Sequence, residues 1–230
     1  REMLRTIQTL DLVNVNLIGN LSTGKTTLSL TLAHLIHKLS VIPFAIRLLN
    51  KNDLLNFEKT LESLDPANYV LIFDDVSFLS ATASKKQIDN VKQQLTEIRH
   101  LKGGQDVKIV NIKNSHYTLA QDKFIRQNDY SFFTSVGSSE TDNMEKIVGT
   151  KYMGKVHEFR RIFKQATDTK KFTYQLGRKG QFTYNYRNPF IPVLFWNNDS
   201  LRPIVSPPRT WIDPVCSICS NYGSKDKFES

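Results

Sequence analysis

Apolar residues gather along this chain in five short, continuous segments. The segments are Leu12–Ile18, Val41–Leu49, Tyr69–Phe73, Val107–Ile112 and Tyr130–Val136. Continuous rather than alternating apolar residues are typical of strands that are covered on both faces, as in a parallel sheet. The pattern therefore predicts five such strands.

The segments between these strands have the apolar spacing of amphipathic helices. Their apolar stripes are Leu28, Leu32, Leu35, Ile36 and Leu39; Leu54, Phe57, Leu61 and Leu64; and Ile88, Val91, Leu95 and Ile98. A repeated strand–helix–strand unit with right-handed crossovers predicts an α/β fold, a three-layer αβα sandwich with a mostly parallel central sheet. Ligands of such folds bind at the carboxyl ends of the strands.

The pattern changes near residue 150, so we predict a core of residues 1–150 and a small, basic, β-containing appendage of residues 151–230. Within the appendage, Tyr152–Ala166 predicts a basic helix. Phe172–Leu176 and Phe182–Arg187 predict a β-hairpin with a cationic tip. An irregular tail is expected after Trp196 because periodicity is weak there and prolines recur, at Pro203, Pro207, Pro208 and Pro214.

Charge separates the same two parts of the chain. Residues 1–150 carry 17 basic and 16 acidic side chains, whereas residues 151–230 carry 14 and 6, which accounts for most of the net charge of +9. A neutral core with a basic appendage suits an enzyme that acts on a polyanion, because cations neutralise phosphates without reading sequence. Solubility is the alternative explanation of the excess charge.

Composition places the chain among globular proteins, with 40% hydrophobic and 23% charged residues. It contains no apolar stretch of the length that a membrane-spanning helix requires, and Arg1–Leu10 lacks the apolar core of a secretory signal. We therefore expect a cytoplasmic protein without a membrane partner. Cys216 and Cys219 have zinc-ligand spacing, but zinc needs four ligands, and His157 is the remote third candidate; free thiols are the alternative.

Residues 19–26 match the phosphate-binding pattern G-x-x-x-x-G-K-[ST], between a predicted strand and a predicted helix. In such a loop, backbone N–H groups and the helix N-terminus face the phosphates of a nucleotide. Lys25 would reach the β- and γ-phosphates of ATP, and Thr26 would bind Mg²⁺. The predicted nucleotide contacts are Gly19, Asn20, Leu21, Ser22, Thr23, Gly24, Lys25, Thr26 and Thr27.

Two acidic residues, Asp74 and Asp75, directly follow the predicted strand Tyr69–Phe73. At the carboxyl edge of the sheet, Asp74 would hold Mg²⁺ and Asp75 would act as general base on the attacking water. Asn114, after the next strand, is the candidate sensor of the γ-phosphate; a turn residue is the alternative interpretation.

Phosphoryl transfer also needs positive charge on the transition state, which a neighbouring subunit can supply as an arginine. Arg126 is our first candidate because it lies just before the fifth predicted strand, where the edge of a subunit could deliver it in trans, and Arg99 is the second. Either arginine could instead be an ordinary surface cation.

This order of elements resembles the additional-strand P-loop ATPases. Within them, Phe73-Asp-Asp, Glu97-Ile-Arg-His100-Leu and Phe124-Ile-Arg-Gln-Asn128 resemble the FtsK/HerA superfamily, and particularly viral genome-packaging ATPases of the poxvirus and archaeal-virus kind. The resemblance covers about residues 10–140. Members commonly have Glu and Gln where this chain has Asp75 and Asn114, which are each one methylene shorter.

The resemblance implies an ATP-driven translocase that threads double-stranded DNA through a homo-oligomeric ring, such as a hexamer, during genome packaging. It also implies a trans-acting arginine, capsid or other motor components as partners, and a location in the host cytoplasm or the virion. The alternatives are another additional-strand ATPase, such as a helicase loader or RecA-like protein, and a nucleotide-dependent switch with little turnover.

Residues 151–190 interleave cations with aromatic residues. The aromatic side chains could pack against the protein or stack on bases. Phosphate contact is the favoured role of the cations at the hairpin, because such contacts need charge and reach rather than a shaped pocket. The candidate DNA contacts are Arg178, Lys179 and Arg187.

Overall fold

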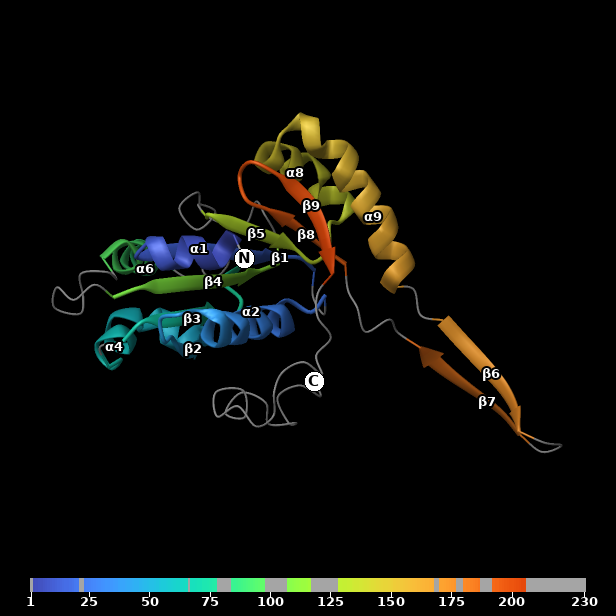
Figure 1. Ribbon diagram of the computed structural model, residues 1–230, viewed down its shortest axis with the longest axis horizontal. Coiled ribbons are helices and arrows are strands. Elements are labelled where there is room, and N and C mark those ends of the chain that lie inside the picture. The colour runs from blue at the N-terminus through green and yellow to red at the C-terminus, as the bar shows by residue number, and fades with distance from the viewer. Residues whose placement is uncertain are drawn as a thin grey trace.

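Figure 1 shows the protein as a computed structural model, with helices on both faces of a central sheet. The residues that it describes are 2–20, 23–65, 67–77, 84–97, 107–116, 128–167, 170–176, 180–186 and 192–205. None of the helices in these ranges has the length and apolar character to cross a membrane.

The described residues form one large sheet and one small one. The strands of the large sheet are β1 (Leu12–Ile18), β2 (Ala45–Leu49), β3 (Tyr69–Phe73), β4 (Ile109–Ser115), β5 (Tyr130–Phe133), β8 (Pro192–Trp196) and β9 (Leu201–Val205). The small sheet pairs β6 (Lys170–Leu176) with β7 (Gly180–Tyr186). The α-helices are α1 (Glu2–Thr9), α2 (Lys25–Leu39), α3 (Lys51–Leu55), α4 (Phe57–Glu62), α6 (Lys85–Glu97), α8 (Thr141–Val148) and α9 (Met153–Thr167).

The strand order of the large sheet is β2-β3-β4-β1-β5-β8-β9. The first five strands of this order run parallel, and β8 and β9 add to them in antiparallel register. Two strands, β3 and β4, therefore separate β2 from β1 and place the end of β3 near the end of β1. The predicted α/β fold with a mostly parallel sheet is confirmed.

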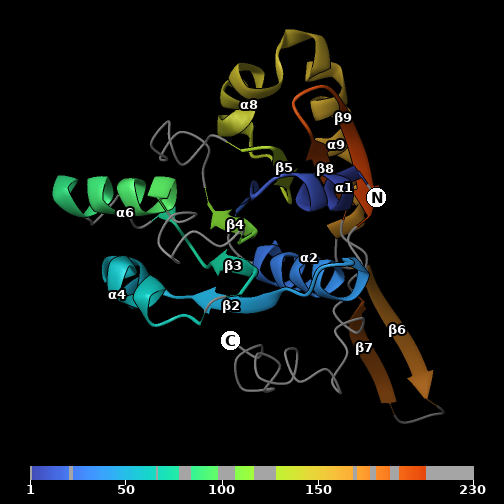
Figure 2. The same ribbon diagram turned by 60° about the vertical axis from the view of Figure 1, so that its left-hand side comes forward.

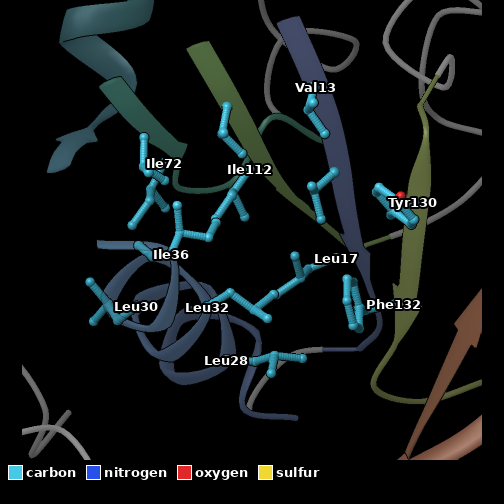
Figure 3. Close-up of a cluster of buried hydrophobic side chains, with 14 of the residues drawn as sticks. Val13, Leu17, Leu28, Leu30, Leu32, Ile36, Ile72, Ile112, Tyr130 and Phe132 are labelled. Carbon is cyan, nitrogen blue, oxygen red and sulfur yellow. The ribbon is translucent and has the colours of Figure 1, made fainter. Parts of the chain in front are cut away.

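Side chains alternate between the two faces of the sheet, so each face has its own core. On one face, α2 packs Leu28, Leu32 and Ile36 against residues such as Leu17 and Ile112 (Figure 3). The other face is covered by α3, α4 and α6 over β2, β3 and β4, and by α8 and α9 over β5, β8 and β9. The result is the predicted three-layer sandwich.

The predicted appendage of residues 151–230 does not stand apart from this sandwich. Its strands β8 and β9 extend the large sheet, and Phe159 of α9 packs with Phe133 of β5 and Leu194 of β8. Of its described strands, only β6 and β7 form a separate sheet, which is the predicted hairpin; its pairing continues to Leu176 and Gly180, so Gly180 belongs to β7 rather than to the turn. In both views this hairpin projects away from the large sheet (Figures 1 and 2).

Several element boundaries differ from the sequence prediction for physical reasons. The strand β2 begins at Ala45 rather than Val41, because Pro43 has no N–H to donate to a neighbouring strand. Conversely, β4 continues to Ser115, three residues beyond the predicted end at Ile112, because its last three residues still pair with the end of β1 although they are polar.

Candidate active site

The phosphate-binding loop connects the end of β1 to the start of α2, as predicted. Gly24 has φ 83°, a left-handed conformation that glycine adopts without strain, and α2 begins at the next residue. Among the described residues, no side chain caps the N-terminus of this 15-residue helix. Its first N–H groups thus lack the side-chain acceptor that many helices have, which suits the binding of an anion.

Gly19 lies where the loop leaves β1, and its surroundings leave no room for a side chain. A Cβ atom built on it would lie 2.2 Å from Thr134 Oγ1, 2.9 Å from Thr23 Oγ1 and 3.1 Å from Ser135 N. Thr134 and Ser135 follow β5, and Ser135 Oγ accepts a hydrogen bond of 2.8 Å from the N–H of Asn20. The end of β5 therefore supports the loop from the side.

Lys25 is buried, with 7% of its surface exposed, and its ammonium group contacts three acceptors. Nζ donates to the carbonyl oxygens of Gly19 and Asn20, both at 2.7 Å, and lies 3.1 Å from Nδ1 of His116. Burial lowers the pKa of Lys25 to about 8, against the opposing effect of Asp75 and Asp74. A bound triphosphate would restore a full positive charge here.

Asp74 meets the loop across the sheet. Thr26 Oγ1 donates a hydrogen bond of 3.1 Å to Asp74 Oδ1, which also accepts one of 3.1 Å from Asn114 Nδ2. The same Asn114 amide donates to Ser29 Oγ at 3.3 Å. Asn114 is a buried strand residue of β4, so the alternative interpretation as a turn residue is wrong.

Asp75 directly follows Asp74 and has the left-handed φ of 58°. Aspartate tolerates this region better than most residues, yet such a backbone is uncommon outside glycine and often marks a functional site. Its Oδ1 accepts a hydrogen bond of 3.1 Å from the N–H of Ser77, and its Oδ2 lies 3.5 Å from Nε2 of His116. Both acids therefore face the same region as Lys25.

These contacts fit Mg²⁺ as well as a triphosphate. A threonine hydroxyl and a carboxylate are hard oxygen ligands of the kind that Mg²⁺ prefers. Asn114 Oδ1 is buried beside them and has no hydrogen-bond partner in the described part of the chain. The water ligands that Mg²⁺ usually keeps would supply donors to it. Among the described residues, no group of three or more His, Cys, Asp or Glu side chains forms a different metal site.

Several predicted site residues lie outside the described part of the chain. They are Leu21 and Ser22 of the loop, the candidate arginines Arg99 and Arg126, the candidate DNA contacts Arg178, Lys179 and Arg187, and the pair Cys216 and Cys219. Their roles stay predictions.

The structure also brings in residues that the sequence did not identify: Ser29, Ser77, Thr134 and Ser135, with His116 as a full member of the site. Thr134 and Ser135 carried one signal, since they are polar residues inside the predicted apolar segment Tyr130–Val136, after the point where β5 ends at Phe133. Ser29 carried a second signal, since it lies one helical turn after Thr26 on the same face of the predicted helix. In the structure, Ser29 Oγ donates a hydrogen bond of 2.8 Å to the carbonyl oxygen of Thr26.

The strand order of the large sheet and the phosphate-binding loop together identify the fold. The chain has the fold of a P-loop NTPase. No protein-family model and no curated protein matches it.

Among solved structures, the chain is similar to the genome packaging NTPase B204 from Sulfolobus turreted icosahedral virus 2. The complex with ATP-gammaS has 14% identity, covers 86% of this chain and 98% of that chain, and has a TM-score of 0.48. The complex with sulfate has the same identity and coverage and a TM-score of 0.47. A chain of the HORMA:CdnC:Trip13 complex of E. coli MS115-1 has 14% identity, with 64% and 55% coverage and a TM-score of 0.39.

Proposed function

We propose that this protein hydrolyses Mg-ATP at the site formed by the phosphate-binding loop and the two acids that follow β3. The observation that carries the proposal is the meeting of Lys25, Thr26, Asp74 and Asp75 at the carboxyl edge of one sheet, beside an uncapped helix N-terminus. These groups come from two segments about 50 residues apart, and a merely structural loop would not need them together.

In this proposal each residue has a distinct task. Lys25 leaves the carbonyl oxygens of Gly19 and Asn20 and binds the β- and γ-phosphate oxygens. Thr26 and Asp74 hold Mg²⁺, which when bound neutralises charge on the phosphates. Asn114 orients Asp74 through its hydrogen bond.

Asp75 is the proposed general base. Its carboxylate accepts a proton from water as the water oxygen bonds to the γ-phosphorus, and the bond from this phosphorus to the bridging oxygen breaks to release ADP. About half of the Asp75 side chain is exposed, so water can reach it. Aspartate is shorter than the glutamate common in the resembled family, and the left-handed backbone at this position brings its carboxylate toward the water.

We further propose that hydrolysis drives movement along double-stranded DNA, and that the protein acts as a homo-oligomeric ring in genome packaging. The support is the resemblance of the motifs, the basic charge of residues 151–230 and the projecting hairpin of β6 and β7. A nucleotide-dependent switch is the second candidate, because an exposed, short general base favours slow turnover.

The experiment that tests this function is phosphate release from Mg-ATP, with and without duplex DNA. We expect DNA to increase the rate of the wild type several-fold, and both Lys25→Ala and Asp75→Asn to abolish the stimulated rate. Tight nucleotide binding with negligible turnover at every DNA concentration would instead support the switch.

Mixing two inactive variants tests the arginine of a neighbouring subunit. An Arg126→Ala subunit keeps its own nucleotide site, and an Asp75→Asn subunit keeps its arginine, so one mixed interface has every group. Activity should reappear on mixing. Two variants that stay inactive together would remove Arg126 from this role, and the same mixture with Arg99→Ala would test the second candidate.

A further inference from the structure

His116 is the first residue after β4, and it contacts both sides of the candidate active site. Its Nδ1 lies 3.1 Å from Lys25 Nζ, and its Nε2 lies 3.5 Å from Asp75 Oδ2. Its backbone N–H donates a hydrogen bond of 2.9 Å to Ser77 Oγ, which holds His116 beside the turn after Asp75. The tasks proposed above use none of these contacts.

The two ring contacts define the tautomer of His116. An ammonium group can only donate hydrogen bonds, so Nδ1 must be the accepting nitrogen beside Lys25. The ring proton therefore lies on Nε2, which faces the carboxylate of Asp75. At 3.5 Å this is an electrostatic contact rather than a hydrogen bond, and it favours a proton on Nε2.

The ring also completes the orientation of the Asp75 carboxylate. Ser77 N–H fixes Oδ1 at 3.1 Å, and His116 faces Oδ2. The turn that carries Asp75 is itself attached to β4, because the N–H of Val76 donates to the carbonyl oxygen of Asn114 at 2.8 Å. One end of β4 therefore holds both the backbone and the side chain of the proposed base.

The contact with Lys25 connects His116 to the phosphate of a bound nucleotide. The three acceptors of its ammonium group match its three protons, and two of them are backbone oxygens of the loop. His116 is the third and is a side chain that can turn. A phosphate that binds Lys25 must replace at least one acceptor, so its arrival changes the surroundings of His116.

We propose that His116 is a positioning residue that orients the Asp75 carboxylate toward the attacking water and links this orientation to Lys25. The inference rests on the proposed hydrolysis of ATP. It assigns to His116 a role in the catalytic step rather than in nucleotide affinity.

Three substitutions separate this role from simple packing. Glutamine can place an amide N–H where Nε2 lies, asparagine can place an acceptor where Nδ1 lies, and alanine does neither. We expect His116→Ala and His116→Asn to lower kcat by about 10- to 100-fold, since a small misplacement of a catalytic group can cost this much. His116→Gln should recover most of kcat, and the Kd for ATP-gammaS should stay within about threefold in all three, the range of uniform binding effects.

His157→Gln is the matched control. Because His157 is exposed on α9, this substitution should leave kcat and the Kd for ATP-gammaS unchanged. Equal kcat values for His116→Gln and His116→Ala would overturn the proposal, as would a wild-type kcat in His116→Ala.

Imidazole ¹⁵N NMR provides a readout that does not depend on turnover. With five histidines in the chain, the His116 signals are assigned by their loss in His116→Gln. We expect a fixed Nε2–H tautomer that changes in both Asp75→Asn and Lys25→Met. An Nδ1–H tautomer, or His116 signals that neither substitution changes, would overturn the proposal.

The two measurements also separate this inference from the proposed function. A wild type that binds but does not hydrolyse ATP contradicts the proposed hydrolysis, and the catalytic role of His116 falls with it. Turnover in the wild type together with unaltered kcat in the His116 variants contradicts only the role of His116.

Discussion

At the residue scale, Gly19 is the position where the nucleotide site depends most directly on the absence of a side chain. A methyl group there would come within 2.2 Å of Thr134 Oγ1 and 3.1 Å of the backbone N of Ser135. The threonine hydroxyl can turn, but the backbone of Ser135 cannot move without its strand. Gly19→Ala must therefore displace the loop or the end of β5.

We predict that Gly19→Ala weakens ATP-gammaS binding by about 5- to 150-fold, because crowding of this kind typically costs about 1–3 kcal/mol. Gly154→Ala is the control, since a Cβ on Gly154 in α9 meets nothing within 4 Å. Calorimetric titration of both variants checks the prediction. Equal affinities would show that the loop does not bind nucleotide in this conformation.

The buried ammonium group of Lys25 makes nucleotide binding depend on pH. Its pKa is lowered to about 8 by burial, so it loses its proton as the pH rises through 8 in the free protein. Only the protonated form attracts phosphate. We predict that the affinity for ATP-gammaS falls above pH 8, by up to about tenfold per unit, as expected for one proton.

Lys25→Arg provides the comparison, because a guanidinium group stays charged throughout this range. Its affinity should be independent of pH between 7.5 and 9.5, whatever its absolute value. A wild-type affinity that is equally flat over this range would contradict the assignment of Lys25 as the phosphate-binding cation.

Some residues of the candidate active site could be predicted from the sequence, and others could not. Lys25, Thr26 and Asp74 could be predicted because their spacing along the chain belongs to a pattern with a known physical basis. His116 and Ser135 could not, because their contacts arise only when β4 and β5 lie beside β1. The sequence around them does not indicate which residues they contact.

At the scale of elements, the apolar pattern predicted strands well where both faces are apolar. The boundaries of β1 and β3 agree with the prediction residue by residue. The pattern failed for β4, whose last three residues are polar and buried, and for β9, which contains Pro203. A proline is tolerated in β9 because this strand lies at the edge of the sheet.

Burial of the ammonium group of Lys113 in β4 lowers the free energy of unfolding. Only 3% of it is exposed, and burial lowers its pKa to about 8, although Asp129 acts in the opposite direction. Between pH 8 and the unfolded value of 10.5, the unfolded chain holds more protons than the folded one. Stability should therefore rise with pH across this window.

We predict that Lys113→Met reduces the rise in the free energy of unfolding between pH 8 and 10, because methionine has no group that titrates in this window. Urea denaturation at pH 7 and 9.5 measures this difference, with Lys59→Met on the exposed side of α4 as the control. An equal rise in stability in Lys113→Met and in the wild type would contradict the assignment of this pH dependence to Lys113.

At the scale of the whole molecule, the β6–β7 hairpin projects on the side opposite α4 and α6 (Figures 1 and 2). Its connection contains Arg178 and Lys179, in the part of the chain that carries 14 basic and 6 acidic side chains. A cationic projection can contact phosphates without a shaped pocket. This arrangement motivates the proposed DNA contact.

We predict that neutralising Arg178 and Lys179 together weakens binding to duplex DNA equally for all sequences. The slope of log K against log salt concentration should become shallower by about 2, since each phosphate contact contributes about 0.9. Lys59→Ala with Lys86→Ala, at the opposite end of the molecule, is the matched control for net charge. An unchanged slope in the hairpin variant would place the DNA site elsewhere.

The central claim is that Asp75 activates water for hydrolysis of a nucleotide held by Lys25. The most direct test compares ATP binding with phosphate release in Asp75→Asn, a variant of nearly the same shape whose asparagine also tolerates the left-handed backbone. Our account predicts an affinity within about threefold of the wild type and a rate reduced by about 10²–10⁴-fold, the usual contribution of a general base. A rate equal to that of the wild type would contradict it.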